Sequence, residues 1–446
     1  MSMQEDNSVF LDRLISNYRL ASEHVADNNK LRSKEWLFIN ERNKKKFTNK
    51  VNIKNFRDYY IWLSEGMDTY GVRNDYKKDT TDNSMRKYFK NSFLNPNYLL
   101  SDHYNSNEKN LPDSSKYTFN IHNKKTTSAE LKRLINICGE SFILKNLIKK
   151  NIGNCPIAYK YKEVYYDLYN LCHLKYFYDL SNKIFQKDIL PRNVIEIGGG
   201  FGVLADYLIK NFKLKYISID LPEANLLTSW YLNQSQNNKK MFLVDDYLKE
   251  GSISKKLFNN YDIFILPPNI KIEDDVMIDL FINIRSMMEM DFSIVKKYFN
   301  LIHKHVSPNG YFYNINRYVS NRNLFNDKKR MAIGASDLSD YPYDENWEVI
   351  MSETSYKHFH MHTLITQRKT DNITKSIKSE LKKIEKISKR FNQNSIFLRG
   401  LRLKNFLKKW TIFLILIFLR KFFSEKNEKK INENLRKIKN IFFKRS

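Results

Sequence analysis

From residue 191 onward, short apolar runs alternate with segments whose apolar positions recur at helical spacing. The runs are rich in Ile, Val, Leu, Phe and Tyr, which is typical of strands. We expect strands at 193–197, 216–219, 262–266, 277–284, 311–315 and 356–366. We expect helices at 204–211, at 223–234 and after Asp291, a residue type that favours helix N-caps. The alternation predicts an α/β fold with a parallel sheet covered on both faces. Residues 241–244 could form a further strand, and that alternative stays open.

The two ends of the chain lack this alternation. Residues 1–190 are aromatic-rich, with helical spacing at 56–67, at 84–94 and through most of 128–190. Two apolar helical faces are expected there, one with Leu131, Leu134, Ile135 and Cys138, the other with Tyr165, Tyr169, Cys172 and Tyr176. The sequence therefore predicts three regions: a mainly helical substrate or cap region at 1–190, a ligand-binding α/β domain at 191–370, and a basic amphipathic helical tail at 371–446.

Glycines cluster at one point of the α/β region. The chain has only 12 glycines in 446 residues, and four of them are Gly198, Gly199, Gly200 and Gly202. They follow the strand expected at 193–197 and precede the helix expected at 204–211. A tight strand-to-helix turn of this kind lets a ligand approach the main chain and presents helix N-terminal amides to it.

Acidic residues flank this turn and limit its ligand. Glu196 lies at the end of the first strand, and Asp220 ends the next one. A carboxylate beside the turn would repel a pyrophosphate, whereas it would attract the cationic amino group of S-adenosylmethionine. An acid at the end of the second strand is suited to a ribose diol. We therefore expect S-adenosylmethionine as cofactor. A turn without a ligand and a nicotinamide or flavin site are the alternatives.

The composition places the chain among basic intracellular proteins. Lys and Arg number 76 against 49 Asp and Glu, a formal net charge of +27. Residues 371–446 alone contain 22 Lys and Arg against 6 Asp and Glu, so the excess belongs mainly to the tail. The three cysteines have no metal-ligand spacing, and the polar, acidic residues 1–10 do not resemble a secretory signal. We expect a cytoplasmic location.

The tail contains a ten-residue segment at 410–419 that is apolar except for Thr411 and is flanked by Lys408-Lys409 and Arg420-Lys421. Ten residues are about half of what a spanning helix needs. A short apolar helix with basic flanks is suited to the surface of an anionic membrane, so we expect peripheral attachment to the inner leaflet. The alternatives are a helix that forms homo-oligomers and a terminal helix packed on the fold.

Three segments carry a resemblance to a known family: Asp279–Met290, Tyr298-Phe299 and Tyr311–Tyr318. Together with the glycine turn, they resemble the sugar O-methyltransferase family of bacterial surface-polysaccharide gene clusters, whose members are class I S-adenosylmethionine-dependent methyltransferases. The resemblance extends from about residue 193 to residue 317 and excludes the tail. It implies a Rossmann-like class I methyltransferase sheet and transfer of a methyl group to a sugar hydroxyl.

The resemblance also implies roles for single residues. The cofactor's amino-acid and ribose parts would lie against Glu196, Gly198, Gly199, Gly200 and Gly202. Asp220 would accept the ribose hydroxyls, Leu221 would lie beside the adenine, and Pro267, in Pro267-Pro268-Asn269, would belong to an adenine-side loop. Asn283, Ser286 and Glu289 would form the floor of the reaction site, with Asn283 also contacting the cofactor.

Methyl transfer to a hydroxyl requires an in-line approach and a base for the proton. Glu289 is the first candidate base, although an acid there could instead stabilise a helix N-terminus. His360 is the second candidate. It alternates with His358 and His362 in the last expected strand, which would place all three on one face. No carboxylate with matching spacing accompanies them, so we expect no metal. Arg317 and Tyr318 are expected to bind a sugar hydroxyl or a phosphate of the acceptor.

Three functions compete. The first is O-methylation of a carbohydrate or lipid-linked glycan. The second is RNA methylation, with the basic tail contacting phosphates. No Asn/Asp-Pro-Pro-aromatic motif and no RNA-binding module is recognisable, so we do not expect nucleic acid as a partner. The third is a non-catalytic protein that kept the cofactor fold.

Overall fold

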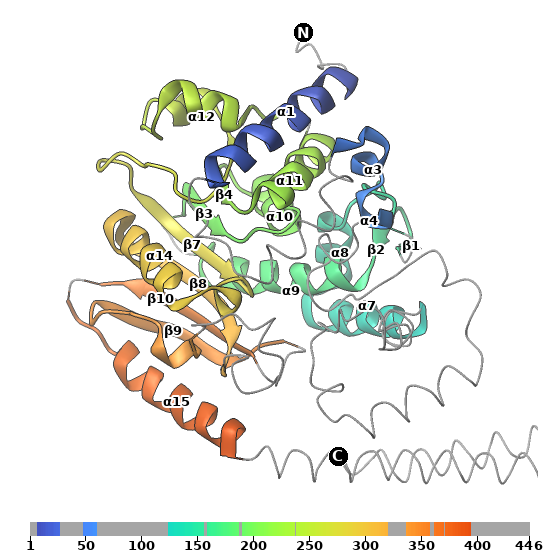
Figure 1. Ribbon diagram of the computed structural model, residues 1–446. Helices are drawn as coiled ribbons and strands as arrows, with labels where there is room; N and C mark the ends of the chain where they lie inside the picture. Colours follow the sequence, from blue (N-terminus) through green and yellow to red (C-terminus); the bar gives the residue numbers. More distant parts are fainter. Residues whose placement is uncertain are drawn as a thin grey trace, which may run out of the picture. The chain divides into compact units, whose positions relative to one another are not determined.

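The computed structural model describes residues 7–26, 48–59, 124–155, 158–186, 190–236, 238–319, 336–356, 361–369 and 371–393 (Figure 1). The chain divides into two compact units, Met1–Ser388 and Lys389–Ser446. The sheet and the candidate site belong to the first unit.

One eight-stranded sheet forms the core of the first unit. Its strands are β3 (Asn193–Ile197), β4 (Lys215–Ile219), β5 (Met241–Phe242), β6 (Ile263–Leu266), β7 (Ile278–Ile284), β8 (Val306–Arg317), β9 (Trp347–Thr354) and β10 (Met361–Arg368). They lie in the order β5-β6-β4-β3-β7-β8-β10-β9. The first six in this order pair in parallel, and β10 pairs antiparallel with β8 and β9. The predicted α/β fold with a mostly parallel sheet is confirmed.

Most predicted strands agree with the structure to within one or two residues. The open alternative at 241–244 is confirmed only for its first two residues, which form β5, because α12 begins at Val244. Strand β8 begins at Val306 rather than at 311, because residues 307–310 are absorbed as an irregularity in its pairing with β7. Asn309 adopts a left-handed φ of 62° there. Strand β10 begins at Met361 rather than at 356, and β9 was not predicted.

Helices cover both faces of the sheet. On one face lie α9 (Leu168–Lys183), α10 (Val203–Asn211) and α11 (Pro222–Ser235), whose buried side chains share a hydrophobic cluster with Tyr313 of β8. On the other face lies α14 (Phe292–His305), where the Phe299 ring contacts the ring of Phe312 with centroids 5.8 Å apart. Phe312 and Tyr313 are neighbours in one strand and therefore point to opposite faces. Two short helices, α12 (Val244–Glu250) and α13 (Leu257–Asn260), connect β5 to β6.

The residues described before the sheet are mainly helical, in agreement with the prediction. It contains α1 (Asn7–Ala26), α3 (Lys50–Lys54), α4 (Phe56–Tyr59), α7 (Lys124–Cys138) and α8 (Glu140–Asn146). The prediction of helices through 128–190 was wrong at one place, where β1 (Tyr159–Tyr161) and β2 (Val164–Tyr166) form a hairpin. Tyr165 therefore lies in a strand rather than on the helical face of Tyr169 and Cys172. Its run Val-Tyr-Tyr is β-branched and aromatic, which favours a strand.

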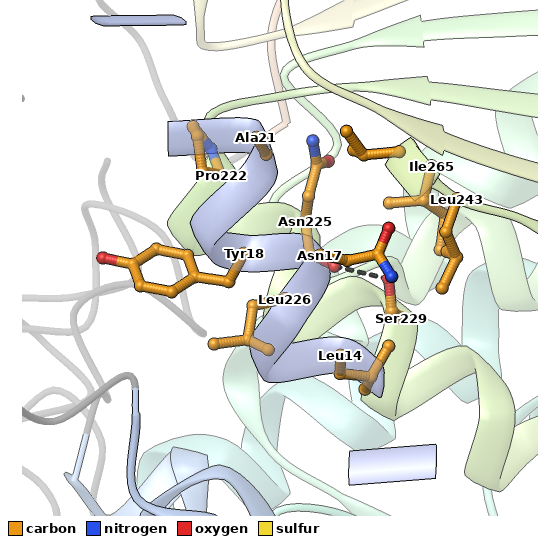
Figure 2. A pocket seen from close by; sticks show the side chains of 11 residues that line it. Leu14, Asn17, Tyr18, Ala21, Pro222, Asn225, Leu226, Ser229, Leu243 and Ile265 are labelled. Carbon is orange, nitrogen blue, oxygen red and sulfur yellow. Dashed lines mark hydrogen bonds between the residues drawn. The ribbon is translucent and has the colours of Figure 1, made fainter. Parts of the chain in front are cut away.

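Helix α1 packs along α11 and also contacts α12 (Figure 1). Its Arg13 guanidinium forms ion pairs with Asp245 (3.0 Å) and Asp246 (2.7 Å) of α12. Figure 2 shows a small cavity left between the helices, bordered by Asn225 of α11. Asn225 also donates its side-chain N–H to the carbonyl of Asp220 at 2.8 Å. Asn225 therefore lies between the cavity beside α1 and the residue that follows β4.

The first helix of the predicted tail, α15 (Ile377–Gln393), packs on the sheet. Its Ile377 and Ile384 are fully buried, Glu380 accepts a hydrogen bond from Ser352 of β9 at 2.6 Å, and Ser388 donates to the carbonyl of Tyr318 at 2.6 Å. The apolar face of α15 is therefore used within the fold.

Several predictions fall on residues outside those described: the helix at 84–94, the rest of 56–67, the histidines His358 and His360, and the apolar segment 410–419. Within the described ranges, no helix is long and apolar enough to cross a membrane.

Candidate functional site

The glycine turn follows β3 and leads into α10, as predicted. Gly198, Gly200 and Gly202 have φ angles of 79°, 60° and 91°. These left-handed values strain any residue with a side chain. A Cβ atom on Gly198 would also lie 2.2 Å from the Ser286 hydroxyl oxygen, and one on Gly200 would lie 3.1 Å from the Tyr169 hydroxyl oxygen. The turn therefore requires bare main chain, and it brings β3 close to residues after β7 and at the start of α9.

Glu196 lies on β3 just before the turn and is 2% exposed. Its carboxylate accepts a hydrogen bond from the Tyr216 hydroxyl at 2.5 Å. Burial, together with the nearby charge of Asp220, raises the pKa of Glu196 to about 7, although the Tyr216 hydrogen bond acts in the opposite direction. An ionised Glu196 would be stabilised by a cationic group in the site.

Asp220 directly follows β4 and faces the same turn. Its carboxylate accepts the N–H of Gly200 at 2.9 Å and its neighbour Leu221's N–H at 2.7 Å. Part of the residue is exposed, but the carboxyl group lies among protein atoms, and burial raises its pKa to about 7 despite both hydrogen bonds. The Asp220 N–H donates to Leu266 at 3.2 Å, which places Pro267 at the adjoining strand end. The structure thus brings together the four glycines, both acids, Leu221 and Pro267.

The segment after β7 forms a hydrogen-bonded floor beside the turn. Asn283 donates to the Ile197 carbonyl at 2.8 Å and to the Ser286 hydroxyl at 2.5 Å, and its oxygen accepts from Asn316 of β8 at 2.8 Å. Asn316 in turn accepts the Met288 N–H at 2.9 Å. This network fixes the 3₁₀ turn η7 (Met287–Glu289).

The network changes the interpretation of Asn283, which was expected to touch the cofactor. Asn283 is fully buried, and both atoms of its amide are engaged by protein groups. It is a positioning residue beneath the site rather than a contact. Ser286 is partly exposed next to Gly198, and Glu289 ends η7 with 5% exposure. Glu289 therefore does not begin the following helix: that helix, α14, has Asp291 as its N-cap residue.

The end of β8 carries Arg317 and Tyr318, which are 4% and 2% exposed. The Tyr318 hydroxyl lies 2.8 Å from Nδ1 of His362, and Nε2 of His362 lies 2.8 Å from the Ser352 hydroxyl. Burial lowers the pKa of His362 to about 4, so the ring is neutral near pH 7. Because Ser352 donates to Glu380, His362 donates from Nε2 and accepts from Tyr318. This chain connects β8, β9, β10 and α15.

The candidate base His360 lies outside the described residues, so the structure places only His362 of the three expected histidines. In the described part of the chain, no group of three His, Cys, Asp or Glu side chains is arranged to hold a metal ion.

Two residues at the turn were not anticipated as part of the site. Phe201, inside the glycine run, is fully buried, and Tyr169 of α9 stacks on its ring with centroids 4.9 Å apart. The sequence placed Tyr169 on an apolar helical face. Its position among many aromatic residues gave no signal that distinguished a site wall from core packing.

The assembled residues fit the predicted cofactor. Left-handed φ angles and neighbouring protein atoms exclude side chains from the glycine turn, so its main chain lies bare beside two buried carboxyl groups at adjoining strand ends. In open parallel sheets, ligands bind outside the carboxyl ends of the strands, which is where these groups meet. A ligand with a cationic amino group and a ribose diol matches this pair of acids.

Comparisons with known proteins give only weak structural likenesses. No family model and no curated protein matches the chain. Similar solved structures include an O-methyltransferase family 2 protein from Planctomyces limnophilus DSM 3776 (8% identity, 45% of this chain and 60% of that chain, TM-score 0.28). They also include the N-methyltransferase NodS from Bradyrhizobium japonicum WM9 (12% identity, 43% of this chain and 89% of that chain, TM-score 0.27). A third is a SAM dependent methyltransferase from Aquifex aeolicus (13% identity, 40% of this chain and 82% of that chain, TM-score 0.24). Scores of this size carry no conclusion about reaction or acceptor, so both are argued from the site.

Proposed function

We propose that this chain is an S-adenosylmethionine-dependent O-methyltransferase that acts on a sugar hydroxyl of a bacterial surface polysaccharide or its precursor. The observation that carries the proposal is the pair of buried acids, Glu196 and Asp220, on either side of a glycine turn that requires bare main chain. When bound, the cofactor supplies a methyl group already activated on a sulfonium sulfur.

Each acid has a distinct role in binding. Glu196 faces the turn from β3 and would neutralise the amino group of the cofactor. Asp220 ends β4, and its oxygens would accept the two ribose hydroxyls in place of one or both main-chain N–H groups. Hydrogen bonds to a charged group contribute about 1.5–3 kcal/mol each, so the pair can provide much of the binding energy.

The acceptor side is supported by the network that joins η7 to β8. The segments 279–290 and 311–318 carried the resemblance to sugar O-methyltransferases, and the Met288–Asn316 hydrogen bond connects them beside the glycine turn. Within this network, Glu289 would take the proton from the acceptor hydroxyl. Arg317, at the end of the neighbouring strand, would bind the sugar or a phosphate on its carrier. Tyr318, whose buried hydroxyl donates to His362, would instead hold this strand end in place.

The first test is calorimetry with S-adenosylmethionine and S-adenosylhomocysteine. We expect binding by the natural chain and at least tenfold weaker binding by Asp220→Ala, as expected for a loss of about 1.4 kcal/mol or more. The matched control is Asp262→Ala, an acid next to the start of β6 whose carboxylate pairs with Lys215 at 3.2 Å. No uptake of either compound by the natural chain would refute the proposal.

The second test is methyl transfer to oligosaccharide, lipid-linked glycan and RNA acceptors. We expect transfer to a glycan, and Glu289→Gln should keep cofactor affinity while lowering turnover by about 100-fold or more, the usual contribution of a general base. Unchanged turnover would remove Glu289 as the base. Methylation of RNA alone would replace the glycan proposal, and cofactor binding without any transfer would favour a non-catalytic protein.

A further inference from the structure

The aromatic ring of Phe201 fastens the glycine turn to the helical region that precedes the sheet. Tyr169 stacks on it at 4.9 Å, and Phe56 and Tyr231 meet it edge-on at 5.3 and 5.1 Å. The Arg57 guanidinium lies over the same ring, 5.1 Å from its centroid. These contacts come from α4, α9 and α11, and each is of a kind that stabilises packed aromatic groups.

A buried ion pair holds the start of α9 in place. Arg57 donates to Asp167 at 2.9 Å, and both side chains are 1% exposed. Asp167 is also the N-cap of α9, where its side chain accepts the N–H of Asn170 at 2.9 Å. Tyr169 lies in the first turn of this helix, so its position is fixed by the same residues that hold Phe201.

The Tyr169 hydroxyl lies close to the main chain of the turn. It would lie 3.1 Å from a Cβ on Gly200, and among the described residues none forms a hydrogen bond with it. Burial and the nearby Glu196 carboxylate raise the pKa of Tyr169, so the hydroxyl keeps its proton and acts as a donor. The Tyr169 hydroxyl can donate to an anionic group, and the nearby Glu196 carboxylate can pair with a cationic one. Together they suit a ligand whose end carries both a carboxylate and an ammonium group.

We propose that the Tyr169 hydroxyl donates a hydrogen bond to the carboxylate of the cofactor's amino-acid end, while Glu196 receives the ammonium group. The inference rests on the proposed function and adds a contact from the helical region before the sheet. That region would then form a wall of the cofactor site in addition to any role in acceptor binding.

The test compares two ligands by calorimetry: S-adenosylhomocysteine, and 5′-methylthioadenosine, which lacks the amino-acid end. Tyr169→Phe keeps the ring stacked on Phe201 and removes only the hydroxyl. We expect the variant to bind S-adenosylhomocysteine at least tenfold more weakly and 5′-methylthioadenosine with unchanged affinity. Tyr178→Phe, on the same helix against Phe142, is the matched control and should change neither affinity.

The outcomes separate this inference from the proposed function. If the natural chain binds S-adenosylhomocysteine and Tyr169→Phe leaves that affinity unchanged, or weakens both ligands equally, the Tyr169 contact is wrong and the cofactor assignment stands. If the natural chain binds neither ligand, both proposals fail. A loss confined to the ligand with the amino-acid end supports the contact, and equal melting temperatures of variant and natural chain would show that folding is not its cause.

Discussion

Single residues at the glycine turn combine binding chemistry with an energetic cost. Glu196 and Asp220 are held where burial raises the pKa of each to about 7, although a shift of this kind disfavours the charged form that a cationic ligand needs. Binding groups are often placed at the expense of stability. The structure therefore predicts that removing such a charge stabilises the ligand-free protein.

Glu196→Gln tests this cost. The folded-state pKa of Glu196 is raised from 4.5 to about 7, so its stabilising contribution is present below about pH 4.5 and is lost as the pH rises through about 7. The glutamine keeps an acceptor for the Tyr216 hydroxyl and carries no charge. Relative to the natural chain, we expect the variant to gain roughly 3 kcal/mol in unfolding free energy at pH 8 and little at pH 4.5.

Denaturant melts at both pH values provide the measurement. Glu250→Gln, at an exposed position at the end of α12, is the control and should show no pH-dependent gain. Saturating S-adenosylhomocysteine should raise the stability of the natural chain more than that of Glu196→Gln. A gain of the same size at both pH values would show that desolvation of the carboxylate is not the cause.

At the scale of elements, the sequence predicted the strands and the turn whose own residues are enough to identify them. Strands β3, β4, β6 and β7 are short, buried runs rich in β-branched and aromatic residues. The glycines, together with Glu196 and Asp220, indicate the turn by their types and spacing. The hairpin β1–β2 was missed because three-residue strands leave no period to recognise. The hydrogen bonds of Asn283 and His362 and the ring contact of Tyr169 were not predicted, because each depends on partners far away in the sequence.

Asn316 shows how elements cooperate at the site. Its side chain connects β8 to Asn283 of β7 and to the main chain of η7, so it holds the turn that carries Glu289. Asn316→Ala leaves the buried Met288 N–H without this acceptor, which costs about 1–3 kcal/mol of stability. We expect turnover to fall at least tenfold, because Glu289 is no longer held, while cofactor affinity changes less than threefold.

The comparison requires both steady-state kinetics and calorimetry on the same protein. Thr366→Val is the matched control: Thr366 is a fully buried polar residue of β10 whose hydroxyl faces the Phe312 carbonyl, away from η7. It should affect stability without separating turnover from binding. A parallel loss of both quantities in Asn316→Ala would mean that the network supports the glycine turn rather than the acceptor side.

At the scale of the whole molecule, the basic tail has two parts with different expected roles. The first helix, α15, buries Ile377 and Ile384 on the sheet, and its Glu380 and Ser388 contact β9 and the end of β8. The residues beyond α15 carry most of the tail's positive charge and its apolar segment. We propose that these later residues attach the protein to an anionic membrane surface, whereas α15 belongs to the fold.

Two truncations test this division. Ending the chain after residue 393 should leave the melting temperature and cofactor affinity unchanged and abolish co-sedimentation with vesicles of anionic lipid. Ending it after residue 371 also removes α15, and loss of two buried isoleucines at about 1.5–3 kcal/mol each should lower the unfolding free energy by roughly 3–6 kcal/mol. Vesicles of neutral lipid, and anionic vesicles at high salt, are the controls, because attraction between a basic segment and anionic lipid is screened by salt. If the chain that ends after residue 393 still binds anionic vesicles, the membrane contact lies elsewhere in the chain.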